Sequence, residues 1–184
     1  MTLVLASASP RRQELIRRVT EDFVVCPADV DEANIPYQTP AEYTLSMAVG
    51  KALAVSGKTP HPVLGADTVV CLGARILGKP RDAEENRAML RALSGRWHTV
   101  LTAVALCRQG RILGTEIVAT RVRFLPLREQ DIEELIQTGD GLDKAGGYGI
   151  QGPAGKYIAG IDGCYYNVMG LPVAAVASLL RAHV

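Results

Sequence analysis

Hydrophobic positions in the first half of the chain fall into short runs that alternate with helical patterns. Each run has the length of a strand, and one of them is interrupted by the polar pair Asp67-Thr68. Alternation of strands and helices is typical of an α/β fold. We therefore expect a short buried strand at residues 3–6 and further strands at residues 23–26 and 63–70.

Helix-start signals stand between and after these runs. Ser9 followed by Pro10 is typical of an N-cap and a first helical residue, and Thr39 with Glu42 has the spacing of a capping box. A second capping box begins at Asp82. We expect helices from Pro10 to about Val19, from Pro40 to about Val55, over 82–93, over 128–138, and from a first-turn Pro172 to near the end of the sequence.

Two β-rich runs occupy the middle of the chain, at residues 100–106 and 117–124, with Gln109-Gly110 near the turn between them. This spacing favours an antiparallel pair. Because strand-helix alternation precedes a hairpin, we expect an α/β fold with a mixed sheet rather than a doubly wound parallel one. The sequence carries no internal repeat and no composition break, so we expect one domain over residues 1–184.

Composition places the chain among globular proteins. Hydrophobic residues make up 48% and charged residues 21% of 184 positions, which excludes wholesale disorder. The formal net charge is +1, so the chain lacks the global basic field on which non-specific nucleic-acid binding depends. Any anion site must therefore be local, and we expect no nucleic-acid partner.

Neither a membrane segment nor a metal-binding cysteine pair is indicated. The apolar run at the start is interrupted by Pro10-Arg11-Arg12, and no stretch approaches the roughly 18 apolar residues of a membrane span. We therefore expect a cytoplasmic protein without a membrane partner. The cysteines form no C-x-x-C pair and are expected to be plain buried thiols: Cys26, Cys71, Cys107 and Cys164.

The first candidate for chemistry is the turn that enters the first helix. A strand that leads into a helix N-terminus directs backbone N–H groups and the positive end of the helix dipole to one place. Arg11 and Arg12 add guanidinium donors that suit phosphate oxygens, while Ser7 and Ser9 add hydroxyls. Alternatively, the arginines form a solvated face and Ser9 is only a cap.

Carboxylates form the second candidate. Asp67 stands among strand residues, where burial costs several kcal/mol unless the charge is paired. Asp31-Glu32 in an acidic loop could add oxygen ligands for Mg²⁺, which usually takes one or two carboxylates plus substrate phosphates. The alternatives are a structural salt bridge for Asp67 and a solvated loop for Asp31-Glu32.

Lysines and a glycine-rich stretch complete the candidates. Lys51 lies on an otherwise apolar helix, and Lys79 precedes Pro80, which discourages helix there. In "DKAGGYGIQG" the glycines permit close approach of backbone to a ligand, and Gln151 offers an amide to a base edge. Surface lysines and simple turn geometry are the alternatives.

These candidates contain no nucleophile-base pair. His61, His98 and His183 have neither triad nor metal-ligand spacing, and neither a P-loop nor a G-x-G-x-x-G motif is present. Carboxylates, cations and glycine loops together favour metal-assisted hydrolysis of a phosphoanhydride, in which electrostatics and positioning supply most of the catalysis.

Motifs along essentially the whole chain resemble one family. "LASASPRRQEL", "DVDE", "KALA", "GADTVV", "ILGKPRD", "LSGRWHTVLTAV", "DKAGGYGIQG" and "NVMGLPV" occur in this order, as in the Maf family of nucleoside triphosphate pyrophosphatases. The resemblance implies an elongated mixed-sheet α/β fold with two lobes around a central cleft, similar to the inosine triphosphate pyrophosphatases. It also implies hydrolysis of a nucleoside triphosphate to the monophosphate and pyrophosphate, in a house-cleaning role.

The resemblance assigns roles by motif. Asp67 matches the proton acceptor and Glu32 a metal-binding or catalytic carboxylate, so Mg²⁺ or Mn²⁺ is expected on Glu32 and Asp67. How these two share the roles of ligand and base is left open. The remaining matches are phosphate contacts at Ser7, Arg12, Lys51 and Lys79, and base-selecting positions at Arg11, Thr68 and Gln151.

The base-selecting positions resemble the dTTP/UTP type, because the 7-methyl-GTP type carries tryptophan, glutamine and glutamate there. The chain departs from the family at Asp140-Gly141, where glutamate-proline is common, and at Cys164, where serine is usual. The alternatives are a 7-methyl-GTP pyrophosphatase and a non-enzymatic nucleotide-binding regulator of septum formation. A homodimer is a possible assembly.

Overall fold

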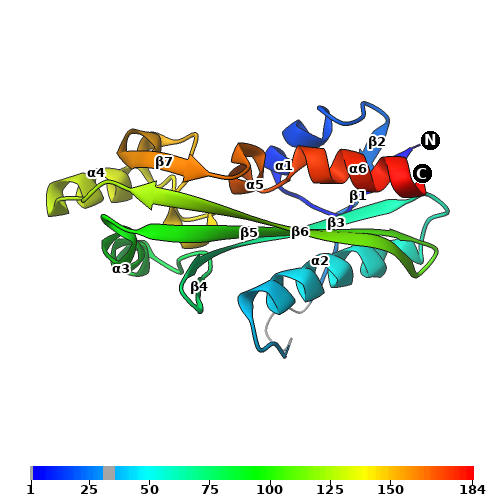
Figure 1. Cartoon of the computed structure of the whole chain (residues 1–184), viewed down its shortest axis with the longest axis horizontal. Coiled ribbons are helices and arrows are strands. Elements are labelled where there is room, and N and C mark those ends of the chain that lie inside the picture. Colours follow the sequence, from blue (N-terminus) through cyan, green and yellow to red (C-terminus); the bar gives the residue numbers. More distant parts are fainter. Residues whose placement is uncertain (1, 31–35) are drawn as a thin grey trace. The chain divides into compact units, whose positions relative to one another are not determined.

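A computed structural model describes residues 2–30 and 36–184, and its strands form one mixed sheet. The strands are β1 (Leu3–Leu5), β2 (Phe23–Val25), β3 (Val63–Leu72), β4 (Arg75–Leu77), β5 (Trp97–Arg108), β6 (Arg111–Phe124) and β7 (Ile158–Asp162). Their order is β2-β1-β3-β5-β6-β7, with β4 paired to β3 (Figure 1). Strand β1 runs parallel to β2 and β3, whereas the β3–β4 and β6–β7 pairs are antiparallel. The expected mixed α/β sheet is confirmed.

The helices flank this sheet (Figure 1). They are α1 (Pro10–Ile16), α2 (Pro40–Ser56), α3 (Ala83–Leu93), α4 (Glu129–Thr138), α5 (Tyr165–Met169) and α6 (Val173–His183), with short 3-10 helices η1 (Ala145–Gly147) and η2 (Pro153–Tyr157). The N-caps Ser9, Thr39 and Asp82 accept hydrogen bonds from backbone N–H groups as the sequence predicts. Pro172 is the N-cap residue of α6, so its predicted place in the first turn was wrong.

The chain divides into two compact units. The first comprises Met1–Thr68, Thr102–Val118 and Gly170–Val184, and the second comprises Val69–Leu101 and Ala119–Met169. Strands β3, β5 and β6 contribute residues to both.

In the first unit, α2 packs closely on β3 at Gly65. A Cβ atom added to Gly65 would lie 2.2 Å from the backbone oxygen of Ala48 and 2.6 Å from the nitrogen of Ala52. Figure 1 shows α2 on one side of these strands and α1 and α6 on the other. Glycine at position 65 thus lets α2 reach the strand that carries Asp67.

The second unit has its own core around an aromatic cluster. Phe124 is fully buried, and its ring centroid lies 4.9 Å from that of Tyr148 and 5.7 Å from that of His98. His98 Nε2 and the Tyr148 hydroxyl are 2.6 Å apart, within hydrogen-bond distance. Burial lowers the pKa of His98 to about 4, because the imidazolium cation would lose its hydration there.

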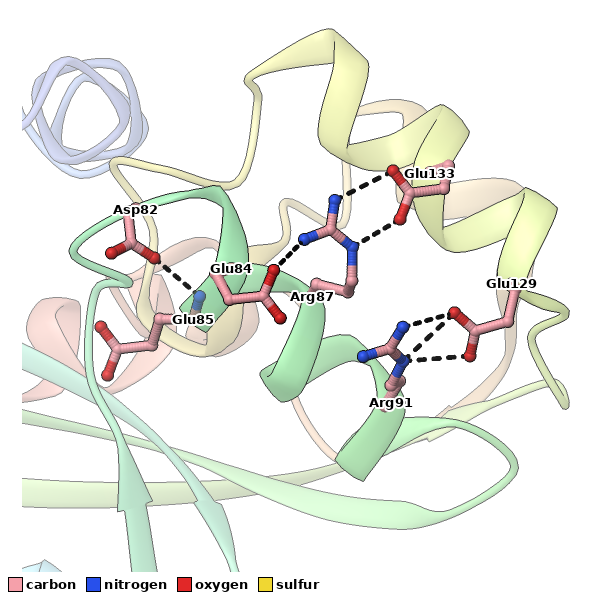
Figure 2. A network of polar contacts seen from close by, with 7 residues as sticks. All are labelled: Asp82, Glu84, Glu85, Arg87, Arg91, Glu129 and Glu133. Carbon is pink, nitrogen blue, oxygen red and sulfur yellow. Dashed lines mark hydrogen bonds and ion pairs between the residues drawn. The ribbon is translucent and has the colours of Figure 1, made fainter.

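Ion pairs join α3 to α4 on the surface of the second unit (Figure 2). The guanidinium group of Arg87 donates to Glu133 on α4 and to Glu84 on its own helix. Arg91 donates to Glu129, one turn earlier on α4. The two arginines therefore fix the register of α3 against α4.

Some predicted boundaries differ from the observed ones. Helix α1 ends at Ile16 rather than near Val19, and β5 and β6 extend beyond residues 100–106 and 117–124. The turn at Gln109-Gly110 joins β5 to β6, with positive φ angles of 49° and 74° at these two residues. Such a two-residue turn matches the twist of antiparallel strands.

The cysteine prediction holds for only part of the set. Cys71 and Cys107 are buried, and burial raises the pKa of the Cys71 thiol to about 11. Cys164 is half-buried, whereas Cys26 is exposed, so its predicted burial was wrong. Strand β2, which Cys26 follows, lies at the edge of the sheet. Among the described residues, no helix is long and apolar enough to cross a membrane.

Candidate active site

Arg12 is oriented by groups from widely separated parts of the first unit. Its Nη1 lies 3.3 Å from Ser7 Oγ and its Nη2 lies 3.1 Å from Thr68 Oγ1. Its Nε donates to the backbone oxygen of Gly170 at 2.9 Å. Ser7, at 7% exposure, is buried, and its hydroxyl also accepts from the Ser9 backbone N–H. Arg12 is therefore a positioned guanidinium and not part of a solvated face.

Thr68 links Arg12 to the interior of the sheet. Its hydroxyl lies 2.9 Å from the hydroxyl of Thr102, a fully buried residue of β5. It also lies 3.5 Å from the Gly170 backbone oxygen. Thr102 was missed by sequence reasoning because a threonine within an apolar strand resembles an ordinary β-former.

Lys51 and Asp67 form a second polar group in the same unit. Lys51 Nζ lies 2.7 Å from Asp67 Oδ1, and the two side chains are 16% and 13% exposed. Pairing removes most of the cost of burying the carboxylate among strand residues. Lys51 is thus not a surface lysine, and the salt bridge foreseen as the structural alternative for Asp67 is present.

The two groups lie on opposite faces of β3. Successive side chains of a strand alternate in direction, so Asp67 shares the face of Gly65, on which α2 packs, while Thr68 points to the other face. Leu64 is the last β3 residue that pairs with β1, and it precedes Asp67 and Thr68 by a few residues. Ser7 follows the end of β1, so it lies at the same end of that strand pair. The carboxyl ends of parallel strands are common places for ligand sites in α/β sheets.

The remaining predicted site residues lie outside these two polar groups. Arg11 lies in the first turn of α1 and is half-buried. Lys79 and Gln151 belong to the second unit, and both are exposed. The turn before Lys79 touches the glycine-rich segment, because the Gly146 N–H donates to the Gly78 oxygen at 3.0 Å. Glu32 lies outside the described residues.

The predicted divalent cation needs oxygen ligands from this chain. No group of three or more His, Cys, Asp or Glu side chains that could hold a metal occurs in residues 2–30 and 36–184. Mg²⁺ does not require one, because it usually binds one or two carboxylates, waters and substrate phosphates. The Asp67 carboxylate is an oxygen donor of that kind, so the residue fits the predicted cation.

The comparisons with known proteins agree with the motifs. The Maf-like protein family matches residues 2–183, and the chain belongs to this family. A dTTP/UTP pyrophosphatase of Anaeromyxobacter dehalogenans (strain 2CP-C) is 50% identical over 182 residues, covering 97% of this chain and 92% of the relative. A dTTP/UTP pyrophosphatase of Clostridium botulinum (strain Kyoto / Type A2) is 44% identical over 185 residues, covering 97% and 95%.

A solved structure gives a weaker likeness. The nucleoside-triphosphatase / dITP/XTP pyrophosphatase of Mycobacterium abscessus matches with a TM-score of 0.46 and 14% identity. The match covers 98% of this chain and 94% of that one. A likeness at this level does not bear on the activity of the chain.

Proposed function

We propose that this protein hydrolyses dTTP and UTP to the monophosphate and pyrophosphate. The observation that carries the proposal is that adjacent β3 residues hold the two polar groups: Thr68 contacts the oriented Arg12 guanidinium, and Asp67 pairs with Lys51. The names of relatives at 44% and 50% identity support the same reaction.

The reaction needs a base or orienting group for water, and Asp67 fits this role. In the proposed step the water oxygen bonds to the α-phosphorus while the bond from that phosphorus to the bridging oxygen breaks. The water proton passes to Asp67 or to Glu32, and pyrophosphate leaves with the bridging oxygen. Lys51 Nζ donates to Oδ1 of Asp67, and we assign the other carboxylate oxygen to the water.

Negative charge grows on the departing pyrophosphate, so cations near it stabilise the transition state. Arg12 and Lys51 supply positive charge from the first unit, and we assign the same role to Lys79. A Mg²⁺ or Mn²⁺ ion on Glu32 and Asp67 would neutralise the triphosphate when bound. Ser7 holds Arg12 and offers its hydroxyl to a phosphate oxygen.

Base choice is assigned to Arg11, Thr68 and Gln151. Each of these side chains offers a donor or an acceptor of the kind that the O2, N3 and O4 edge of thymine or uracil requires. Thr68 already contacts Arg12, so base and phosphate recognition meet at one hydroxyl.

Isotope incorporation tests the reaction itself. The protein is incubated with dTTP and Mg²⁺ in water enriched in ¹⁸O, and the products are analysed by mass spectrometry. Label in the thymidine monophosphate and none in the pyrophosphate is the expected result. Label in inorganic phosphate or pyrophosphate would place the attack at another phosphorus, and an absence of products would favour a nucleotide-binding regulator.

A further inference from the structure

Asp140 and Lys144 form an ion pair inside the glycine-rich segment of the second unit. Lys144 Nζ donates to the Asp140 carboxylate at 3.0 Å and to the Asp140 backbone oxygen at 2.5 Å. It also donates to Asp143 Oδ1 at 2.7 Å. The Lys144 side chain is only 15% exposed, so the ammonium group is held among these oxygens.

The pair lies directly against the backbone of two glycines. A Cβ atom on Gly152 would lie 2.3 Å from Asp140 Oδ2, and one on Gly149 would lie 2.9 Å from Lys144 Cε. Neither glycine has a positive φ angle. Glycine is therefore required here because a Cβ atom would have no room, and not because of the backbone conformation. The carboxylate and the lysine stem therefore form the surface on which this backbone rests.

These glycines flank the turn that carries Gln151. The Gly152 N–H donates to the Gly149 oxygen at 3.1 Å, which closes a four-residue turn with Ile150 and Gln151 at its centre. The Gln151 side chain is exposed. Because both ends of the turn rest on the ion pair, the place of the Gln151 amide depends on Asp140 and Lys144.

We propose that Asp140 and Lys144 are positioning residues that set base selectivity by holding the Gln151 turn, without contacting the base. This inference rests on the proposed function, in which Gln151 contacts the base. Loss of either charge breaks the ion pair that holds the residue 140 side chain beside Gly152. The amide of Gln151 then has no fixed position, so discrimination between uracil and cytosine falls while the chemistry at phosphorus continues.

The test uses the full chain and charge-removing variants. Lys144→Met keeps most of the stem that packs on Gly149, and Asp140→Asn keeps the volume of the carboxylate. The matched control is Lys156→Met in the same unit, because Lys156 pairs with Glu134 on the surface and both side chains are more than half exposed. Hydrogen-deuterium exchange of a peptide covering residues 148–155 reports the Gly152 turn directly.

We expect faster exchange in this peptide for Lys144→Met and for Asp140→Asn, and no change for the control. The ratio of kcat/KM for UTP over CTP should fall on the order of tenfold, mainly through a higher KM for UTP. Lys144→Met made in a Gln151→Ala background should add no further loss, since both changes remove the same contact.

Three results would overturn the positioning role: exchange at the wild-type rate, a selectivity equal to that of Lys156→Met, or losses that add fully in the double variant. Exchange is measured without substrate, so it separates this inference from the proposed function. A wild-type chain that hydrolyses no nucleoside triphosphate would remove the proposed function. Unchanged exchange in an active enzyme would remove the positioning role alone.

Discussion

Lys51 Nζ lies 2.7 Å from Asp67 Oδ1, and this ion pair joins α2 to β3 with both side chains largely shielded from solvent. The pairing holds one carboxylate oxygen of Asp67 and gives the side chain a fixed orientation. A structural salt bridge and a catalytic carboxylate are therefore compatible at this position, and kinetics separates them.

Asp67→Asn should lower kcat for dTTP by about 10²–10⁴-fold, because the amide keeps the shape of the carboxylate but accepts no proton. Steady-state pyrophosphate release with excess dTTP measures the change. Asp162→Asn is the matched control, since Asp162 is a surface residue paired with Arg121, with a side chain 68% exposed. Near-normal turnover by Asp67→Asn would exclude Asp67 from the mechanism.

Arg12→Lys should raise KM for dTTP by about tenfold or more. A lysine keeps the charge but cannot contact Ser7, Thr68 and the Gly170 oxygen together as the guanidinium does. Arg91→Lys on α3 serves as the control, because Arg91 belongs to the surface pairs of Figure 2. Equal KM values for the two variants would show that Arg12 acts only through its charge or not at all.

His98 should make the second unit sensitive to acid. The unfolded chain binds a proton at His98 near pH 6.5, whereas burial keeps the folded-state pKa at about 4. The unfolded state therefore binds more protons, so the free energy of unfolding should fall as pH drops from about 6.5 to about 4. The loss attributable to His98 should reach about 3 kcal/mol.

Urea denaturation between pH 4 and pH 7.5 measures this loss. A His98→Gln variant should lose that part of the pH dependence, and His61→Gln should keep it because His61 is exposed. Parallel pH profiles for the wild-type protein and His98→Gln would show that His98 does not titrate in this way.

Gly65→Ala should destabilise the first unit by about 3 kcal/mol, since the added Cβ meets the backbone of α2 and a backbone cannot rotate away. Gly57→Ala is the matched control, because nothing lies within 4 Å of a Cβ added there. Thermal or urea unfolding compares the two. Equal stability of both variants would mean that α2 can move off β3 at little cost.

Local signals in the sequence predicted much of the fold. The caps at Ser9, Thr39 and Asp82 are satisfied within a few residues, so the starts of their helices follow from sequence alone. Strands β4 and β7 were not predicted, because "RIL" and "IAGID" are interrupted by charged residues or glycine and lack the continuous apolar run of β1 and β2. The exposure of Cys26 was not predicted either, because the position of β2 at the sheet edge depends on how all the strands are ordered.

For the candidate site, the sequence predicted the residues better than the contacts between them. Motif resemblance selected Ser7, Arg12 and Thr68, but composition and spacing could not show that one guanidinium joins the other two. The backbone oxygen of Gly170 carries no sequence signal for this role. Asp140 and Lys144 lie between α4 and η1, outside any helix, so their four-residue spacing does not by itself predict the ion pair.

The substrate preference of the purified protein tests the proposed hydrolysis of dTTP and UTP. Pyrophosphate release is followed with Mg²⁺ for dTTP, UTP and 7-methyl-GTP, and kcat/KM is obtained for each. We expect dTTP and UTP to be preferred over 7-methyl-GTP by about tenfold or more, because a site that pairs its polar groups with one kind of base discriminates against the others. A preference for 7-methyl-GTP, or no pyrophosphate from any of the three, would contradict the proposed function.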